Sequence, residues 1–485
     1  MIRRRVGAVG LAALVSVALG AGPLAVPLRA QGPDASVLPL EAFLARVVAT
    51  HPVARQAEWT RRQVTADLRA ARGAFDPAVT ATWDLKRFNG VGYYDEVDAR
   101  LIVPTPWGVD VKLGWERAAG QIINPERKTP GAGLLAAGIS IPVGPRLLTD
   151  ERRTALRQAE LAEDAAEAER LGAVARLTQA AAREWGAWAE AEARARIADE
   201  GVALAAFRLD AVRRRVAAGD VASIDSVEAL AEWERRRVAA LEAGALRVAA
   251  RLAVAGYLWR EDGAPDSLRS AVQPATGFLA RTVPGAAAVR RAVEGHPAVA
   301  QARARFLQAD AQRRLTAFSV LPTASVEVSS LAAGTSFGAV PSGGESDYKA
   351  AAAVRLPLLA RRELGRLAST EARARQLALE RDRVRREVEL AAERALVDVE
   401  AIGAQIDAQA RVVVATEALL VAEQRRFEAG ESSLLIVNLR ERALLDERLR
   451  AAQLVARRAA AWGALAAALG TPAALVDVPS GRPAR

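Results

Sequence analysis

Two kinds of hydrophobic pattern alternate along this chain, and each predicts a different element. Residues 77–86 and 322–329 alternate apolar and polar side chains with a period of two, which is typical of a strand between unlike environments. The apolar positions are Val79, Ala81, Trp83 and Leu85 in the first segment and Val326 and Val328 in the second. Returning strands follow at Gly138-Ile-Ser-Ile and Ala353-Val-Arg-Leu. We therefore expect strands within about 77–142 and 322–357.

Two long stretches without proline show a different pattern. No proline occurs between Pro145 and Pro265 or between Pro357 and Pro472, and Ala, Arg, Glu and Leu fill both gaps. This composition predicts helix throughout. Each stretch is interrupted once, by an Arg-x-x-Ala-Gly sequence that ends at Gly219 or at Gly430. Glycine can end a helix in the left-handed conformation, and the serines that follow can cap the next helix. The prediction is two helical hairpins, at 147–258 and 359–470.

The chain contains an internal duplication. Its two histidines both precede proline, in His51-Pro52 and His296-Pro297, and they stand 245 residues apart. At the same offset, Gln63 meets Gln308 and Pro77 meets Pro322. Matches at a fixed spacing indicate a repeated unit. Each unit is predicted to run helix, strand, strand, long helical hairpin.

These boundaries divide the chain into five expected segments. The first repeat spans 31–260 and the second spans 285–470, with a linker rich in Pro, Gly and Asp at 261–284. A charged start followed by a short apolar run predicts a signal peptide at 1–30, and a flexible tail is expected at 471–485. The first repeat holds about 30 more residues between its strands than the second. They predict an extra hairpin near 95–120, which either joins the sheet or caps it.

Composition excludes several classes of function. The chain has no cysteine, and it shows no Gly-rich phosphate loop, no Gly-x-Ser-x-Gly turn and no paired metal ligands, so neither an enzyme nor a cofactor or metal site is expected. The histidines are interpreted as structural because each precedes a proline that begins a helix. The formal net charge of +10 includes four arginines within residues 1–30, and the other arginines alternate with glutamates along the predicted helices. Solvated helix faces explain this charge better than binding to nucleic acid.

Aromatic residues gather in the first predicted sheet. Trp83, Tyr93, Tyr94, Trp107 and Trp115 lie close together in the sequence. Such a group is typical of the aromatic girdle of a membrane β-barrel. The alternative is the core of an ordinary soluble β-sandwich.

The repeated order of elements, the His-Pro openings and the Arg-x-x-Ala-Gly turns together resemble the TolC family of outer membrane efflux proteins. The resemblance implies a mainly α fold with a β-barrel portion: a shared transmembrane barrel in the outer membrane above a periplasmic tunnel of antiparallel coiled coils. It implies a homotrimer in contact with outer-membrane lipid. It also implies passive export of substrates that a periplasmic adaptor and an inner-membrane pump deliver at the helical tips.

In that family the two glycine turns, here Gly219 and Gly430, form the periplasmic entrance. Asp225 matches a family aspartate that holds the entrance shut. The positions of its tyrosine and arginine partners hold Phe427 and Ser432 here, and Phe427 cannot donate the corresponding bond.

Two acidic positions that ring the entrance in that family correspond to Ile436 and Leu439 here. The acidic ring therefore cannot be carried over to this chain. Glu228, Glu431 and Asn438 are further candidates for a substitute lock. The alternative is that all these residues only form turns and caps.

A soluble periplasmic coiled-coil or adaptor-like protein is the rival function. It would share the long helices but would have no use for two amphipathic hairpins at the same point of a duplicated unit. No pattern in the sequence indicates the exported substrate.

Overall fold

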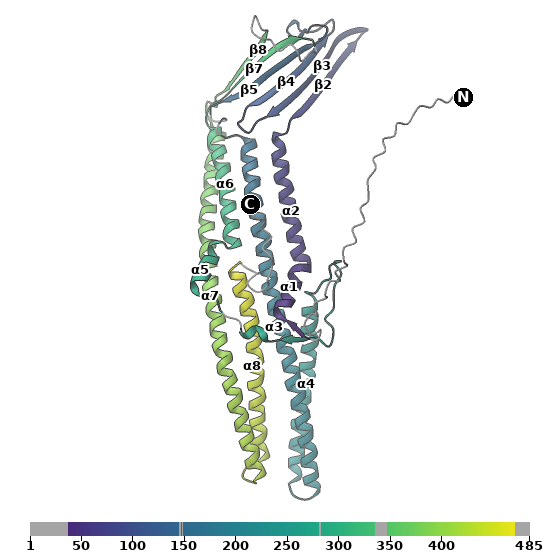
Figure 1. The fold of residues 1–485 in the computed structure, drawn as a ribbon, viewed down its shortest axis with the longest axis vertical. Helices are drawn as coiled ribbons and strands as arrows, with labels where there is room; N and C mark the ends of the chain where they lie inside the picture. The colour runs from purple at the N-terminus through teal and green to yellow at the C-terminus, as the bar shows by residue number, and fades with distance from the viewer. Residues whose placement is uncertain (1–36, 145–146, 148, 281–282, 335–346, 471–485) are drawn as a thin grey trace, which may run out of the picture.

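Four columns of helices lie side by side beneath one sheet, so that the molecule is a long rod (Figure 1). The computed structural model describes residues 37–144, 147, 149–280, 283–334 and 347–470. The predicted signal peptide and the predicted tail lie outside these residues. Within them, no helix combines the length and the apolar character that crossing a membrane requires.

Two helices run almost the whole length of the rod. They are α3 (Glu151–Ala217) and α7 (Arg361–Glu428). The other two columns each consist of an upper and a lower helix: α2 (Pro52–Arg72) above α4 (Ser223–Ala255), and α6 (Pro297–Ser319) above α8 (Leu434–Ala468). Across the rod the order is α2 or α4, α3, α6 or α8, and α7 (Figure 1). The layer therefore ends in two open sides, formed by α7 and by α2 with α4.

The two His-Pro sequences begin α2 and α6. His51 Nδ1 accepts a hydrogen bond from the Val53 N–H at 3.2 Å, and His296 Nδ1 accepts one from the Ala298 N–H at 3.1 Å. Each histidine thus caps its helix while proline occupies the first turn, where it has no N–H to leave unpaired. Burial lowers the pKa of both histidines, which keeps their rings neutral and able to accept.

Close contact between α3 and α8 depends on two glycines. A Cβ atom on Gly463 would lie 2.7 Å from the Ala182 Cβ, and one on Gly186 would lie 2.7 Å from the Ala456 carbonyl oxygen. Helices rich in small side chains can approach this closely only if the contact positions stay small. The alanine-rich composition is therefore a requirement of this interface.

A small layer covers the middle of the rod on one face. It contains β1 (Val37–Pro39) paired in parallel with β6 (Gln273–Ala275), α1 (Leu40–Thr50), the 3-10 helix η4 (Gly277–Ala280) and α5 (Ala286–Glu294). We call it the equatorial layer. Its core packs on Trp185 and Trp188 of α3, which are fully buried, and Phe278 meets Trp185 edge to face with centroids 5.3 Å apart. Part of the expected linker, 261–284, lies in this layer.

Six antiparallel strands form a single sheet at the upper end. In spatial order they are β2 (Ala78–Phe88), β3 (Val91–Pro104), β4 (Asp110–Ala119), β5 (Leu134–Val143), β7 (Thr323–Ala333) and β8 (Tyr348–Arg355). A short 3-10 helix, η1 (Gly73–Phe75), precedes β2, and another, η2 (Pro125–Arg127), lies between β4 and β5. In the described part of the chain, β2 and β8 have no partner on their outer edges. The sheet is open, like the helical layer beneath it.

One face of this sheet is apolar across all six strands. The register aligns Val103, Val111, Ile139, Val328 and Ala350 in one row. Neighbouring rows add Val79, Ala81, Trp83, Leu101, Leu113, Trp115, Leu135, Val326 and Val354. The charged residues of the strands lie mainly on the opposite face. Within the described residues no helix covers the apolar face, and Val79 and Val354 are each 75% exposed.

The aromatic residues of the first repeat do not form one level of a girdle. Tyr93 lies near the end of the sheet away from the helices and contacts Phe88, with ring centroids 6.3 Å apart. Trp107 lies in the turn between β3 and β4, at the other end. Trp83 pairs with Val97 in between. Residues that are close in sequence lie at different heights of the sheet here, because the chain reverses direction twice between them.

We expect the Gly463→Ala substitution to destabilise the rod by about 1–3 kcal/mol, because the added methyl group forces α8 away from α3. Gly244→Ala is the matched control, since a Cβ at this helical position meets nothing within 4 Å. The control should stabilise α4 by roughly 0.5–1 kcal/mol. Heat unfolding of the detergent-solubilised protein, followed by circular dichroism, measures both. Equal effects of the two substitutions would contradict close contact at Gly463.

Candidate functional site

Both helical hairpins turn at the lower end of the rod through the same backbone motif. Gly219 has φ of +78° and Gly430 has φ of +75°. The N–H of Asp220 donates to the Arg215 carbonyl at 2.9 Å, and that of Glu431 donates to the Arg426 carbonyl at 2.8 Å. These bonds, across a left-handed glycine, form the Schellman motif that ends helices. The Arg-x-x-Ala-Gly sequences therefore place two equivalent tips at one end of the molecule (Figure 1).

The serines after these turns do not cap the next helices as the sequence suggested. The N-cap of α4 is Ala222, and Ser433, the N-cap of α8, makes no capping bond through its side chain. Ser432 instead donates its hydroxyl hydrogen to Glu423 Oε1 of α7 at 2.5 Å. Glu423 is buried, so this bond fixes the second tip to its own hairpin.

A buried ionic network joins the two hairpins above the tips. Glu441 of α8, only 2% exposed, accepts hydrogen bonds from Arg208 of α3 at 2.8 Å and from Arg236 of α4 at 3.0 Å. Arg208 also donates to Asn438 Oδ1 at 2.7 Å. Arg208 lies nine residues before the end of α3, about 14 Å above it at 1.5 Å per residue. The first hairpin is thus held to the second close to the tips.

Glu232 forms the second half of this network. Its Oε1 accepts from Arg236 Nε at 3.0 Å on the same helix and from Arg442 Nε of α8 at 3.2 Å. Burial by itself raises the pKa of Glu232, but the hydrogen bonds from Arg442 and Arg236 outweigh it and lower the pKa from 4.5 to about 2. Removing one partner from such a network would leave a buried charge unpaired, which is strongly destabilising.

The residues predicted from the sequence have different environments. Asn438 is buried and belongs to the network, and Phe427 is half-buried against the apolar cluster of Leu420, Val437 and Leu444. Asp225 lies in the first turn of α4, and Glu228 lies one turn later. The pKa of Arg442 is raised mainly by its hydrogen bond with Glu232, and the charge of Glu228 adds a smaller contribution.

Glu431 is exposed at the second tip. No side-chain hydrogen bond joins Asp225, Glu228 or Glu431 to the other hairpin among the described residues. The structure therefore connects one of the predicted residues, Asn438, to the first hairpin.

Sequence reasoning missed Arg208, Glu232, Arg236, Glu441 and Arg442. Asn438, Glu441 and Arg442 share the spacing that puts them on one face of α8, and Glu232 and Arg236 are one turn apart. The same spacing recurs in many exposed Arg–Glu pairs, such as Arg385 with Glu389. Nothing in the sequence marks which pairs become buried between helices.

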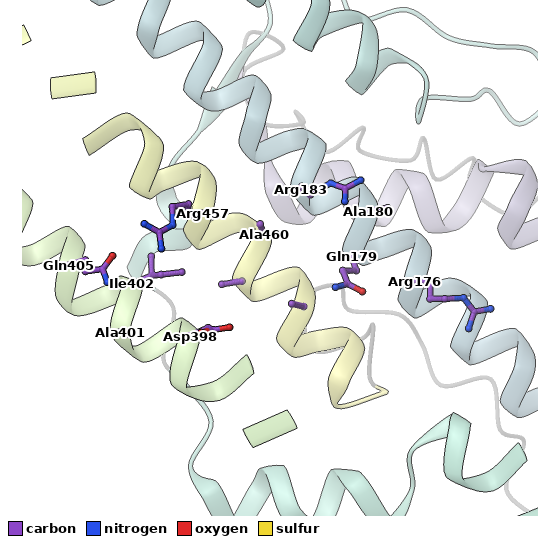
Figure 2. A pocket seen from close by; sticks show the side chains of 12 residues that line it. Arg176, Gln179, Ala180, Arg183, Asp398, Ala401, Ile402, Gln405, Arg457 and Ala460 are labelled. Carbon is purple, nitrogen blue, oxygen red and sulfur yellow. The ribbon is translucent and has the colours of Figure 1, made fainter. Parts of the chain in front are cut away.

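A second feature is a groove between α3, α7 and α8 near the middle of the rod (Figure 2). Its volume is about 610 Å³, and alanines of α8 line it together with Arg176, Arg183, Arg457 and Asp398. Arg183 precedes Trp185 by two residues, about 200° around the helix. The groove therefore lies on the face of the helical layer away from the equatorial layer. Its excess of arginine would attract anions.

No group of three or more His, Asp or Glu side chains in the described residues is arranged to hold a metal ion. The two histidines act as helix caps, and His296 Nε2 also lies 3.2 Å from the Ala467 carbonyl oxygen. The network holds the helices of the two hairpins together, and the groove presents arginine side chains to solutes.

Comparison with known proteins identifies the fold. The sequence profile of the outer membrane efflux protein family matches residues 288–471. No curated protein matches the chain by sequence.

Three solved structures share the fold over most of the chain. The Neisseria gonorrhoeae MtrE outer membrane channel, in its open state, is 16% identical with a TM-score of 0.64, covering 89% of each chain. CusC, described as forming a transmembrane channel, is 14% identical with a TM-score of 0.63 over 89% of this chain and 92% of its own. The outer membrane protein VceC of Vibrio cholerae is 17% identical, with a TM-score of 0.62 over 89% and 96%.

We expect Glu232→Gln to weaken the lower rod in a pH-dependent way. Because the pKa of Glu232 in the folded protein lies below its ordinary value, its charge contributes stability that is complete above about pH 4.5 and is lost as the pH falls toward 2. The difference in free energy of unfolding between the original protein and the variant should be about 3 kcal/mol at pH 7 and should vanish near pH 2.

Glu234→Gln is the control, because Glu234 pairs at 2.9 Å with Arg237 of its own helix and is half exposed. Its effect should be under about 1 kcal/mol at every pH. Denaturant titration of both variants between pH 2 and pH 7 tests the assignment. A constant difference across that range would refute it.

Proposed function

Because the chain belongs to the outer membrane efflux protein family, we propose that it is the outer-membrane export channel of a tripartite efflux or secretion system. Substrates would pass from an inner-membrane pump and its periplasmic adaptor through the helical rod and out across the outer membrane. Family membership favours this function over a soluble periplasmic adaptor-like protein. The family is one of channels and not of enzymes, so transport without chemistry is the expected activity.

The observation that carries the proposal is the uncovered apolar face of the sheet. Leucine, valine and tryptophan side chains cover this face, and Trp83 and Leu85 are 68% and 61% exposed. In water such a surface would be covered or would aggregate. In lipid it is stable if every strand has partners on both sides, which only a closed barrel provides. The sheet has long strands and an apolar exterior, so the missing partners are the edge strands of further copies.

The open sides of the helical layer support the same assembly. Strand β8 lies above α7 and strand β2 lies above α2, so each open side of the rod continues into an open edge of the sheet (Figure 1). A ring of copies would close both at once, joining β8 to β2 and α7 to α2 and α4 of the neighbour. We propose the homotrimer that the family resemblance implies. The groove containing Arg176, Arg183 and Arg457 lies on the face opposite the equatorial layer. With the equatorial layer on the outside of the ring, this groove would line the tunnel.

We propose that the division of the chain predicted from the sequence applies in this assembly. Residues 31–260 and 285–470 would be the two repeats of each subunit, joined by 261–284, after removal of a signal peptide at 1–30 and with a tail at 471–485. The tips at Gly219 and Gly430 would form the periplasmic entrance and would contact the adaptor and the pump. We propose that the network of Arg208, Glu232, Arg236, Asn438 and Glu441 holds the entrance closed. Asp225, Glu228, Phe427, Glu431 and Ser432 would line it below the network.

We expect the full-length protein to partition with outer membranes, to need detergent for extraction, and to migrate as a trimer. Native mass spectrometry and electron microscopy of the detergent extract would show threefold particles with a central pore. Recovery of a monomer in detergent-free buffer would instead support the soluble adaptor-like protein.

We expect Glu441→Gln to open the entrance. The substitution keeps the shape of the side chain but removes the charge that Arg208 and Arg236 share, so the hairpins should separate more readily. Single-channel conductance in planar bilayers should rise several-fold, while Glu234→Gln leaves it unchanged. The double substitution Asp225→Asn with Glu431→Gln tests the predicted tip residues in the same assay. If conductance stays the same in that variant, these two carboxylates have no role in closure.

A further inference from the structure

We propose that β3 and β4, the extra hairpin of the first repeat, are wall strands of the barrel and do not cap it from outside. This inference rests on the proposed channel function. It gives each chain six wall strands where a strict duplication of the second repeat would give four. Its basis is the length, pairing, faces and turns of the two strands.

The length of both strands suits passage through a membrane. Strand β3 has 14 residues and β4 has 10, compared with 11 in β2 and 10 in β5. A tilted transmembrane strand needs about 9–11 residues. A hairpin that only covered the outer opening would have no such requirement.

In the described sheet, β3 and β4 lie between β2 and β5 and join these two strands. Strand β2 pairs with β3, β3 pairs with β4, and β4 pairs with β5, all antiparallel; the register shifts once, between Lys86 and Arg87 of β2 near its turn to β3. If the hairpin lay outside the wall, β2 would have to pair with β5 directly. Among the described residues β2 and β5 do not pair, so removing β3 and β4 from the wall would leave a gap between them.

The faces of the inserted strands agree with those of their neighbours. Leu101 and Leu113 face the same side as Val79 and Ile139, whereas Arg100 and Lys112 face the other side. Lys112 Nζ reaches across β5 to Glu327 Oε2 of β7 at 2.6 Å, and Arg100 Nη2 lies 2.5 Å from Asp98 Oδ2. These ion pairs lie on the polar face, which would be the barrel interior. A strand with lipid on one side and water on the other needs this alternation.

The turns place the hairpin through the full height of the sheet. Asn89 and Gly90, both with positive φ, make the tight turn from β2 to β3 at the end away from the helices. The turn from β3 to β4 lies at the helical end, where Arg152 of α3 donates to Asp110 at 2.8 Å. A cap on the outer opening would not reach the first turn of a tunnel helix.

Three copies would therefore close a barrel of three times six strands, or 18. Barrel diameter grows roughly linearly with strand number, so this barrel would be about 1.5-fold wider than one built from four strands per chain. Barrels of 16–18 strands hold a water-filled channel. The membrane portion would thus pass bulky, hydrated, charged cargo, and the entrance at the tips would set the size limit.

Single-cysteine labelling tests the position of the hairpin, since the chain has no cysteine of its own. The variants are Leu101→Cys and Arg100→Cys on β3, with Leu113→Cys and Glu116→Cys on β4 as a second pair in case one β3 variant fails to assemble. The matched controls are Val326→Cys and Ser325→Cys on β7, a strand of the second repeat. Each trimer is reconstituted in phosphatidylcholine vesicles and exposed to a water-soluble maleimide.

For wall strands, cysteines on the polar face should react at least about tenfold faster than those on the apolar face, which lipid protects, in β3, β4 and β7 alike. Alternation in β7 with equal, fast labelling of both faces in β3 and β4 would overturn the inference and leave the channel function standing. Equal labelling in all three strands would mean that the sheet is not in lipid. That result would overturn the proposed function together with the inference.

Discussion

The backbone hydrogen bonds at the two edges of the sheet set the constraint on which this molecule depends. A strand in hydrocarbon cannot leave its N–H and C=O groups unpaired, and β2 and β8 each present a full row of them. Lipid around the apolar face would keep water from pairing with these edge groups. The helical layer below the sheet is open on the same two sides. In the proposed channel, a single chain would satisfy neither its edges nor its apolar face, and assembly into a ring would be part of its folding. Stability would then depend on the concentration of subunits as much as on contacts within one subunit.

The helices contact each other through different kinds of side chain at mid-height and near the tips of the rod. At mid-height, α3 and α8 meet through glycine and alanine, and tryptophans of α3 anchor the equatorial layer. Near the tips the hairpins meet through the ionic contacts of Glu232 and Glu441, and Leu434 of α8 packs against Leu209, Val212 and Ala229 of the first hairpin. Apolar contact is insensitive to charge, whereas a buried ionic contact has discrete bonded and broken states. In the proposed channel, the lower end would be the part of the rod that separates while the middle stays closed.

Much of this architecture could be predicted from the sequence. The proline-free stretches located α3, α4, α7 and α8, because helix propensity over such lengths leaves few alternatives, and the two glycine turns were evident from their left-handed requirement. The period-two pattern at Val79–Leu85 located an edge strand and its apolar face. In contrast, the role of Ser432 was misjudged, since a serine near a helix start can bond to a neighbouring helix as well as to its own backbone.

The ionic network could not be predicted for a related reason. Arg208 and Glu441 are 233 positions apart, and each resembles dozens of exposed charges around it. Their burial depends on which helix lies opposite, which is a property of the assembled layer.

Two of the four helical columns are interrupted at the equatorial layer, and this has a mechanical consequence. The α2–α4 and α6–α8 columns each break at the level of the equatorial layer, whereas α3 and α7 pass through it without a break (Figure 1). Torque applied at the tips by a docked partner would therefore reach the upper rod through two continuous helices, α3 and α7, in each subunit. In the proposed channel, the two broken columns would let the lower half of the rod untwist while the sheet keeps its shape.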